Sequence, residues 1–182
     1  DVIKELNSWG KWYLDTTSVD GFRLDAVKHI RSEFYPEWLT NLRKLSEKKL
    51  FSVGEYWSTS IDTINKYIEK TEGCMSLFDV PLHYNFYRAS ISNGEYDMSK
   101  IFEDTLVASN PMKAVTFVDN HDTEPGQALE SWVLDWFKPL AYSLILLRRD
   151  GFPCVFYGDY YGIPEKNVES KNDMLSLLLK VR

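Results

Sequence analysis

The sequence predicts an α/β protein built on a parallel sheet, and three observations lead to that fold class. Short apolar, β-rich runs alternate with segments whose apolar residues recur at helical spacing. Acidic residues lie at or just beyond the ends of three of the strand-like runs. No strong domain linker interrupts the 182 residues, which are enough for one domain with a buried core. Because alternating strands and helices form parallel sheets covered by helices, we expect one helix followed by five strand–helix units.

Five runs are expected to form the strands, because each is short and rich in β-branched, aromatic or other apolar residues. These runs cover residues 21–27, 50–54, 76–80, 113–118 and 153–157. Five parallel strands fit either an open doubly wound sheet or part of an eight-stranded barrel. The strand pattern alone leaves both alternatives open.

Six segments carry apolar stripes at the spacing of a helix. They cover residues 2–14, 34–48, 60–70, about 99–107, 129–149 and 172 onwards. A loop containing Asn93-Gly94 is expected to follow the third strand. Pro139 is expected to kink or split the fifth helix, because proline lacks the N–H that an interior helical position donates.

Composition excludes several classes of function. The net charge is −6 and no basic stripe is present, so we expect no nucleic-acid partner. No apolar run approaches the length of a membrane span, so we expect no membrane partner. Cys74 and Cys154 are too few for a disulfide scaffold or a zinc site and are expected to be buried free thiols. No phosphate-cradling glycine motif is present, which disfavours an open-sheet nucleotide enzyme.

Asp25, Glu55 and Asp122 are the candidate catalytic residues, because each lies where a predicted strand gives way to a loop. Active residues of parallel α/β folds gather at these strand ends. Neighbouring strands lie about 4.8 Å apart, which is compatible with the separation of about 5–5.5 Å between the two carboxyl groups of retaining glycosidases. Each acid alone could equally cap a helix or pair with a base. The three together favour cleavage of a glycosidic bond.

Two neighbours support this interpretation. Arg23 shares a strand face with Asp25, and a fixed cation would keep that carboxylate ionised, as a nucleophile requires. Glu55 lies beside Tyr56 and Trp57, where loss of solvent would raise its pKa and suit a proton donor.

The segments that carry these residues resemble the alpha-amylase family of glycoside hydrolases, and they look closest to its bacterial liquefying-type members. Three short motifs match the family in the right order: Gly-Phe-Arg-x-Asp-Ala-x-Lys-His at 21–29, Gly-Glu-Tyr-Trp at 54–57 and Phe-Val-Asp-Asn-His-Asp at 117–122. Looser similarity covers essentially the whole chain. The resemblance implies a partial TIM (β/α)8 barrel, comprising about strands 4–8 with their helices.

The resemblance also implies a role for each matching residue. Asp25 matches the nucleophile, Glu55 the general acid/base and Asp122 the acid that stabilises the transition state. The substrate-binding positions are matched by Arg23, Lys28, His29, Trp57 and His121. His29 also matches the position whose backbone carbonyl binds a structural calcium ion, so calcium is the expected cofactor, with a site incomplete in this chain. Trp57 could equally be a packing residue.

The same alignment implies that residues 1–182 are the C-terminal part of one catalytic barrel domain. Strands 1–3, the inserted domain and the C-terminal β domain of the family are absent, and about 250 residues are typical of the barrel alone. The chain also lacks an initiator Met and a signal peptide, and both of its ends suggest a piece of a longer protein. We expect the isolated fragment to be poorly soluble or molten, with little activity, because its sheet would be open at both edges.

The expected activity of the complete enzyme is endo-hydrolysis of α-1,4-glucosidic bonds in starch- or glycogen-like glucans by a retaining double displacement. The expected partner is an α-glucan polysaccharide or oligosaccharide, and the parent enzyme is expected to be a monomer. A transglycosylase or another α-glucoside hydrolase of the family is the alternative, and a non-catalytic glucan-binding relative is disfavoured because all three acids are present. Starch is too large to enter cells, which favours an extracellular over a cytoplasmic location.

Overall fold

The computed structural model describes all residues, Asp1–Arg182, which form two units with separate packing. The first unit comprises residues 1–58 and 62–78. The second comprises residues 59–61 and 79–182. Each unit combines parallel strands with helices, as the alternating pattern of the sequence predicts.

The first unit contains three parallel strands, β1 (Gly21–Leu24), β2 (Phe51–Gly54) and β3 (Ser76–Phe78). Strand β2 lies in the middle, pairing with β1 on one side and with β3 on the other. Three of its four residues are buried, which is why the strand reads as an apolar run in the sequence.

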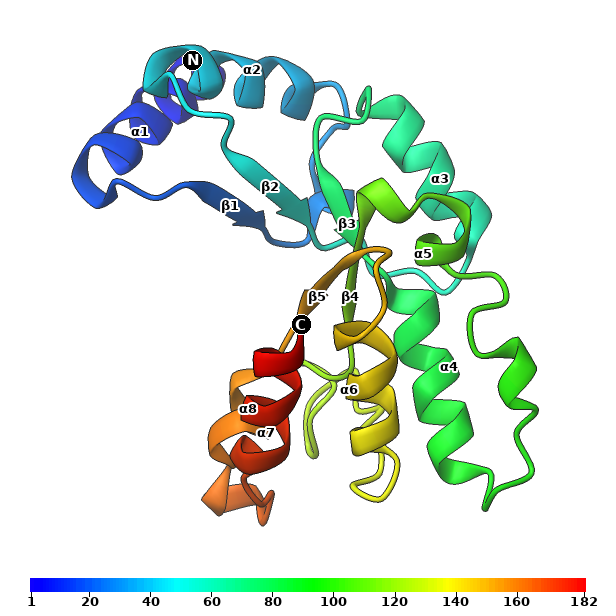
Figure 1. Ribbon diagram of the computed structural model, residues 1–182. Helices are drawn as coiled ribbons and strands as arrows, with labels where there is room; N and C mark the ends of the chain where they lie inside the picture. The colour runs from blue at the N-terminus through cyan, green and yellow to red at the C-terminus, as the bar shows by residue number, and fades with distance from the viewer. The chain divides into compact units, whose positions relative to one another are not determined.

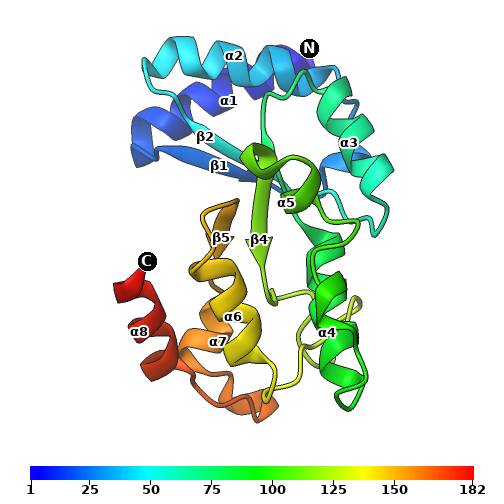
Figure 2. The ribbon, with the colours of Figure 1, turned by 45° about the vertical axis from the view of Figure 1, so that its right-hand side comes forward.

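Helices α1 (Val2–Thr17) and α2 (Phe34–Ser46) lie side by side over β1 and β2 (Figures 1 and 2). A side chain at Gly10 would place its Cβ 2.8 Å from Leu42 Cδ2, so glycine allows the helices to approach closely. The Trp38 indole N–H donates to the Leu6 carbonyl at 3.1 Å and ties the same pair together. The helical segments of the unit are α1 (Val2–Thr17), η1 (Val27–His29), α2 (Phe34–Ser46) and α3 (Ile61–Lys70).

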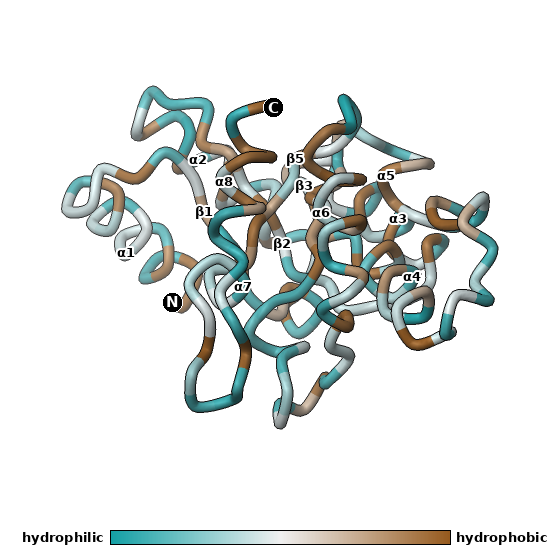
Figure 3. The backbone as a smooth tube through the Cα atoms, turned by 60° about the horizontal axis from the view of Figure 1, so that its bottom comes forward, coloured by the Kyte–Doolittle hydropathy of each residue, from teal (hydrophilic) through white to brown (hydrophobic).

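The second unit contains two parallel strands, β4 (Ala114–Phe117) and β5 (Phe152–Cys154). All four residues of β4 are buried. The longer helices are α4 (Val80–Ile91), α6 (Lys138–Leu146) and α8 (Asn172–Val181). The short ones are η2 (Met98–Lys100), α5 (Leu106–Ser109), η3 (Pro111–Lys113), α7 (Tyr157–Tyr161) and η4 (Pro164–Lys166). The apolar carboxyl half of α6 is brown in Figure 3.

All five predicted strands are present, although each is shorter than expected, and helix α4 is missing from the prediction. Residues 80–91 form this helix, whereas the sequence suggested a loop after the third strand. Eight of its twelve residues are buried, so it lacks the polar face that reveals an amphipathic helix. The Asp79 carboxylate caps its first turn by accepting the Leu82 N–H.

Two predicted helices are wrong in extent. The helix expected at about 99–107 is divided, because Asp104 has a left-handed backbone (φ 53°) and Thr105 caps the short helix α5. The helix expected at 129–149 begins only at Lys138. Pro139 therefore lies in the first turn, where no N–H is needed, and it starts the helix rather than kinking it.

The two cysteines are not joined in a disulfide, and neither is buried as expected. Cys74 is half-buried, and Cys154 is exposed on β5. None of the helices is both long and apolar enough to cross a membrane.

Candidate active site

The ends of strands β1 and β2 bring two predicted catalytic acids to the same edge of the first unit. The strands pair in register with Leu24 opposite Gly54, so Asp25 and Glu55 each follow a paired residue directly. The Glu55 N–H continues the ladder by donating to the Leu24 carbonyl at 2.8 Å. The prediction that successive strands bring these two residues together is confirmed.

A tight turn fixes the Glu55 side chain. Its Oε2 atom accepts the Ala26 N–H at 2.8 Å, and only 8% of the residue is exposed. Ala26 adopts a left-handed backbone (φ 43°, ψ 43°), which is uncommon for a residue with a side chain. The strained turn therefore directs a backbone donor from the residue after Asp25 at the Glu55 carboxylate.

The glycine before Glu55 is required by close packing under the site. A Cβ on Gly54 would lie 2.6 Å from Met75 Sδ and 3.2 Å from Val27 Cγ1. Any larger residue would force these side chains to move away from β2.

Arg23 and Asp25 form an ion pair, as their shared strand face predicts. The Arg23 Nη1 atom donates to Asp25 Oδ1 at 2.7 Å. The Asp25 side chain is 73% exposed, so its carboxylate is accessible while the guanidinium holds one of its oxygens. A charge-assisted hydrogen bond of this kind limits the rotation of the carboxylate.

The remaining predicted residues of the first unit surround this pair of strand ends. Lys28 and His29 are exposed on η1, directly after the Ala26 turn. Trp57 is half-buried two residues beyond Glu55. Tyr56, between them, packs against Tyr67 with ring centres 4.5 Å apart.

His121 and Asp122 form a second group, on the loop that follows β4 in the second unit. The His121 Nε2 and Asp122 Oδ2 atoms are 3.4 Å apart. The Asn120 side-chain oxygen accepts the N–H groups of Asp122 and Thr123 at 2.9 and 3.0 Å. This Asn turn sets the backbone from which both candidate residues project.

Behind this loop lies a buried charge cluster to which the sequence interpretation gave no role. Lys138 contacts the carboxylates of Asp119 and Asp159, and all three side chains are fully buried. Burial raises the pKa of Asp119 to about 7, while the Lys138 ammonium acts in the opposite direction. One feature of the sequence could have indicated a buried lysine: Lys138 lies between Phe137 and Pro139, in an otherwise apolar run.

His83 also packs against this loop, where both of its ring nitrogens have hydrogen-bond partners. Its Nδ1 atom lies 2.6 Å from the Val118 carbonyl and so carries the proton, because a carbonyl can only accept. Its Nε2 atom lies 2.8 Å from the Ser131 hydroxyl. Burial lowers the pKa of His83 to about 4, so the ring is neutral at pH 7.

No group of three or more His, Cys, Asp or Glu side chains in the chain could hold a metal ion. Calcium prefers six to eight oxygen ligands, and the backbone carbonyl of His29 could supply one of them.

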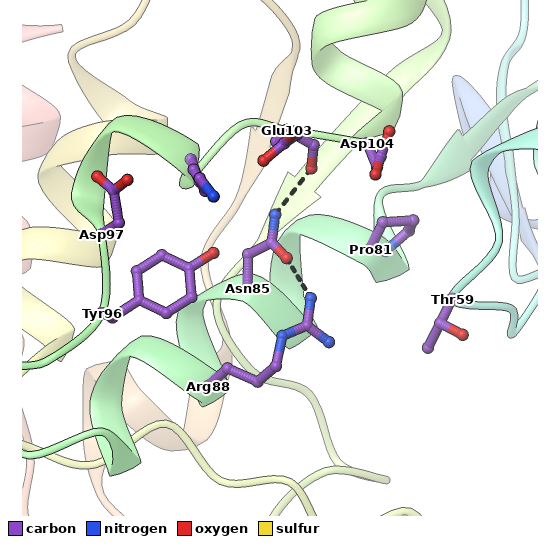
Figure 4. Close-up of a pocket in the computed structure, with 9 residues that line it drawn as sticks. Thr59, Pro81, Asn85, Arg88, Tyr96, Asp97, Glu103 and Asp104 are labelled. Atoms are coloured by element: carbon purple, nitrogen blue, oxygen red, sulfur yellow. Dashed lines mark hydrogen bonds between the residues drawn. The ribbon is translucent and has the colours of Figure 1, made fainter.

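A hollow of about 270 Å³ lies in the second unit, and none of the predicted site residues lines it (Figure 4). Asn85 donates to the carbonyls of Ile101 and Glu103, and its side-chain oxygen accepts from Arg88. The amide of Asn85 is therefore already engaged within the protein. The lining residues are Thr59, Pro81, Asn85, Arg88, Tyr96, Asp97, Lys100, Glu103 and Asp104.

Carboxylates at the ends of parallel strands, flanked by helices, are typical of the class of parallel α/β enzyme domains. A family model described as "Alpha amylase, catalytic domain" matches residues 1–179. The chain therefore belongs to the alpha-amylase family of glycoside hydrolases, and the predicted family is confirmed.

Curated relatives agree with this assignment. The chain is 59% identical over 182 residues to an alpha-amylase of Geobacillus stearothermophilus, covering 100% of the chain and 33% of that protein. It is 50% identical to a glucan 1,4-alpha-maltohexaosidase of Bacillus sp. (strain 707), covering 100% of the chain and 35% of the relative. It is 51% identical to a cytoplasmic alpha-amylase of Escherichia coli (strain K12), covering 92% of the chain and 34% of the relative. The chain thus spans about a third of the length of these relatives.

A solved structure confirms the fold class. The crystal structure of an Anoxybacillus alpha-amylase superposes with a TM-score of 0.75 at 22% identity, covering 99% of this chain and 42% of that one. The chain is part of a (β/α)8 barrel, as predicted.

Proposed function

We propose that the protein containing this chain hydrolyses internal α-1,4 bonds of starch- or glycogen-like glucans with retention of anomeric configuration. One observation carries the proposal: Asp25 and Glu55 follow paired residues of β1 and β2, and Glu55 accepts a hydrogen bond from the residue after Asp25. Membership of the alpha-amylase family and the names of its relatives support the substrate class.

In the first step, the Asp25 carboxylate attacks the anomeric carbon while Glu55 gives its proton to the leaving glycosidic oxygen. The bond to the leaving sugar breaks, and a covalent glycosyl ester forms on Asp25. The Arg23 guanidinium, 2.7 Å from the attacking carboxylate, holds it in one orientation.

In the second step, Glu55 is a carboxylate and removes a proton from water. The resulting hydroxide attacks the anomeric carbon and breaks the ester, which regenerates ionised Asp25 and protonated Glu55. The Ala26 N–H at 2.8 Å holds the Glu55 carboxyl group in one orientation through both steps. If a sugar hydroxyl replaced water in this step, the same residues would perform transglycosylation.

The other residues are proposed to bind the sugar chain. Asp122 and His121 would grip hydroxyl groups of the sugar at the cleaved bond, and their 3.4 Å contact would orient the imidazole. On the first unit, Lys28 and His29 would line the leaving-group side, and Trp57 would offer an aromatic face.

We further propose that the parent protein is a monomer, acts outside the cell and binds a structural calcium ion. The His29 carbonyl would supply one ligand, and the others would come from parts of the protein beyond this chain. No chemical step depends on that ion.

The test is Glu55→Gln in the complete protein that carries this chain. The amide oxygen can still accept the Ala26 N–H, so the change removes the proton and leaves that contact. We expect starch cleavage to fall by about 10²–10⁴-fold. Glu33→Gln is the matched control, because Glu33 is exposed on a different segment, near Arg31.

A substrate with an acidic phenol as leaving group separates the role of Glu55 from general damage. Departure of such a group needs no proton, so its release in the first turnover should be far less affected than starch cleavage. Product anomers followed by NMR should initially be α in the unmodified enzyme. Equal loss on both substrates, or β-anomers as first products, would refute the retaining mechanism with Glu55 as proton donor.

A further inference from the structure

The loop that carries His121 and Asp122 is long and has no regular secondary structure. It runs from the end of β4 at Phe117 to the start of α6 at Lys138 (Figure 1). Twenty residues without a helix or strand have no backbone ladder to place them. The position of Asp122 must therefore come from side chains that fix the loop.

Asp119 connects the two arms of this loop. Its Oδ1 atom accepts the Thr123 hydroxyl at 2.9 Å, one residue beyond Asp122. Its two oxygens lie 3.4 and 3.3 Å from the Val133 N–H, on the returning arm. The Ser131 N–H donates to the Thr123 carbonyl at 3.1 Å and closes the same loop.

Lys138 holds Asp119 from the end of the loop. Its Nζ atom lies 2.9 Å from Asp119 Oδ2, and it also contacts the Asp159 carboxylate. The same ammonium lies 3.0 Å from the ring centre of Trp132, another loop residue. The Tyr142 hydroxyl donates to Asp159 Oδ2 at 2.6 Å, so the second carboxylate is itself held in place.

Stability alone explains this cluster poorly. All three charged side chains are fully buried, and the loss of hydration for such groups commonly exceeds what their attraction returns. Apolar replacement of a buried ion cluster is often neutral or stabilising. What apolar residues cannot supply is a directional link from the start of α6 to the two arms of the loop.

We propose that Lys138 is a positioning residue, whose ammonium acts through Asp119 to hold the loop that presents Asp122 to the substrate. The inference rests on the proposed function, because it assumes that Asp122 stabilises the transition state. Lys138 does not touch the sugar in this proposal. Its effect should therefore appear in the rate of the chemical step rather than in substrate affinity.

The test is Lys138→Met in the complete protein, measured with a soluble maltooligosaccharide. Methionine fills similar volume without charge. We expect kcat to fall by roughly 10- to 100-fold, as for a displaced catalytic group, with KM changing by less than about threefold. Ile145→Val is the matched control on the same helix, since it removes a buried methyl group away from the cluster and should leave kcat unchanged.

A double-mutant cycle with Asp122→Asn distinguishes positioning from general loosening. If Lys138 acts through Asp122, adding Lys138→Met to Asp122→Asn should lower kcat by less than about threefold further. Should Lys138→Met fail to fold, Asp119→Asn takes its place in the cycle, because it keeps the shape of the side chain but weakens its attraction to Lys138. Near-ultraviolet circular dichroism checks that each variant is folded.

Two results would overturn the inference. One is a folded Lys138→Met protein with kcat within twofold of the parent, while Asp122→Asn is strongly impaired. The other is an equal loss of kcat in the presence and absence of Asp122. If Asp122→Asn itself retained full activity, the proposed role of Asp122 would fail first, and the positioning role of Lys138 with it.

Discussion

Two groups of candidate residues, one in each unit, are held in place by different means. Asp25 and Glu55 follow paired strands directly, and their contacts come from residues at most two positions from one of them in the chain. Asp122 lies on a loop of twenty residues, and its placement depends on Lys138 and Asp159, which are 16 and 37 positions away. The first group is fixed by strand register, and the second by a buried ion cluster.

This difference has a consequence for how each group tolerates change. Strand pairing places the acids of the first group even if a neighbouring surface contact is lost. In the second group no strand pairing places the loop, so removal of a distant buried side chain should displace Asp122. The two groups should therefore differ in how far from the substrate a damaging substitution can lie.

The largest effect is expected for Asp25→Asn. The amide cannot form the ester intermediate, so starch cleavage by the complete protein should fall by at least about 10⁴-fold. Initial rates of reducing-sugar release check this. Asp20→Asn is the matched control, because Asp20 lies just before the same strand and forms an exposed ion pair with Lys48 at 2.9 Å.

If Asp25→Asn cleaved starch at the rate of the parent protein, Asp25 would not be the nucleophile. The first group would then not be a catalytic group, and its contrast with the second would fail. A large loss in Asp20→Asn would instead show that damage to the fold at the start of β1, rather than chemistry at its end, controls the rate.

The next largest effect is expected on the free energy of unfolding. It comes from His83, which packs against the loop of the second group. Its folded pKa of about 4 lies below the ordinary value of 6.5, because burial disfavours the cation and Lys138 repels it, although Asp119 lies only 4.0 Å away. Between these values the unfolded chain binds more protons than the folded one. The stability contributed by neutral His83 is therefore complete above pH 6.5 and is lost as the pH falls towards 4. The loss should be on the order of 3 kcal/mol.

The variant His83→Asn separates the contribution of His83 to the pH dependence of stability from that of the nearby carboxylates. Its amide can still donate to the Val118 carbonyl, but it does not titrate. The difference in apparent melting temperature between parent and variant should shrink as the pH falls from 7 to 4. A difference that stays constant across this range would show that His83 is not buried as a neutral ring.

The contrast also explains which parts of the site the sequence could predict. The ion pair between Arg23 and Asp25 follows from a spacing of two residues on a strand, and the meeting of Asp25 with Glu55 follows from the pairing of successive strands. Both are short-range rules. The role of Lys138 follows from no local rule, because the two carboxylates that it contacts lie 19 residues before it and 21 residues after it in the chain.

The errors in secondary structure have the same origin. Residues 129–137 carry a helical pattern, but the N–H groups of Ser131 and Val133 donate to the Thr123 carbonyl and the Asp119 carboxylate instead. Helix α4 lacks an amphipathic pattern because most of it is buried. In both places, tertiary contacts decide the backbone conformation, and local propensity does not.

The smallest expected effect is that of Arg23→Gln on kcat. It tests most directly whether strand register alone is enough to place Asp25. The Arg23 guanidinium donates a hydrogen bond at 2.7 Å to the carboxylate of Asp25, whose side chain is 73% exposed. Water can replace much of that interaction, so kcat should fall by roughly tenfold, near the lower limit expected for Lys138→Met. Lys48→Gln, which removes another exposed partner of an aspartate in the same unit, should leave kcat unchanged. If Arg23→Gln proved far more damaging than Lys138→Met, a single exposed contact would matter more than the buried cluster. Strand register would then not suffice to orient the nucleophile, and the proposed difference between the two groups would be wrong.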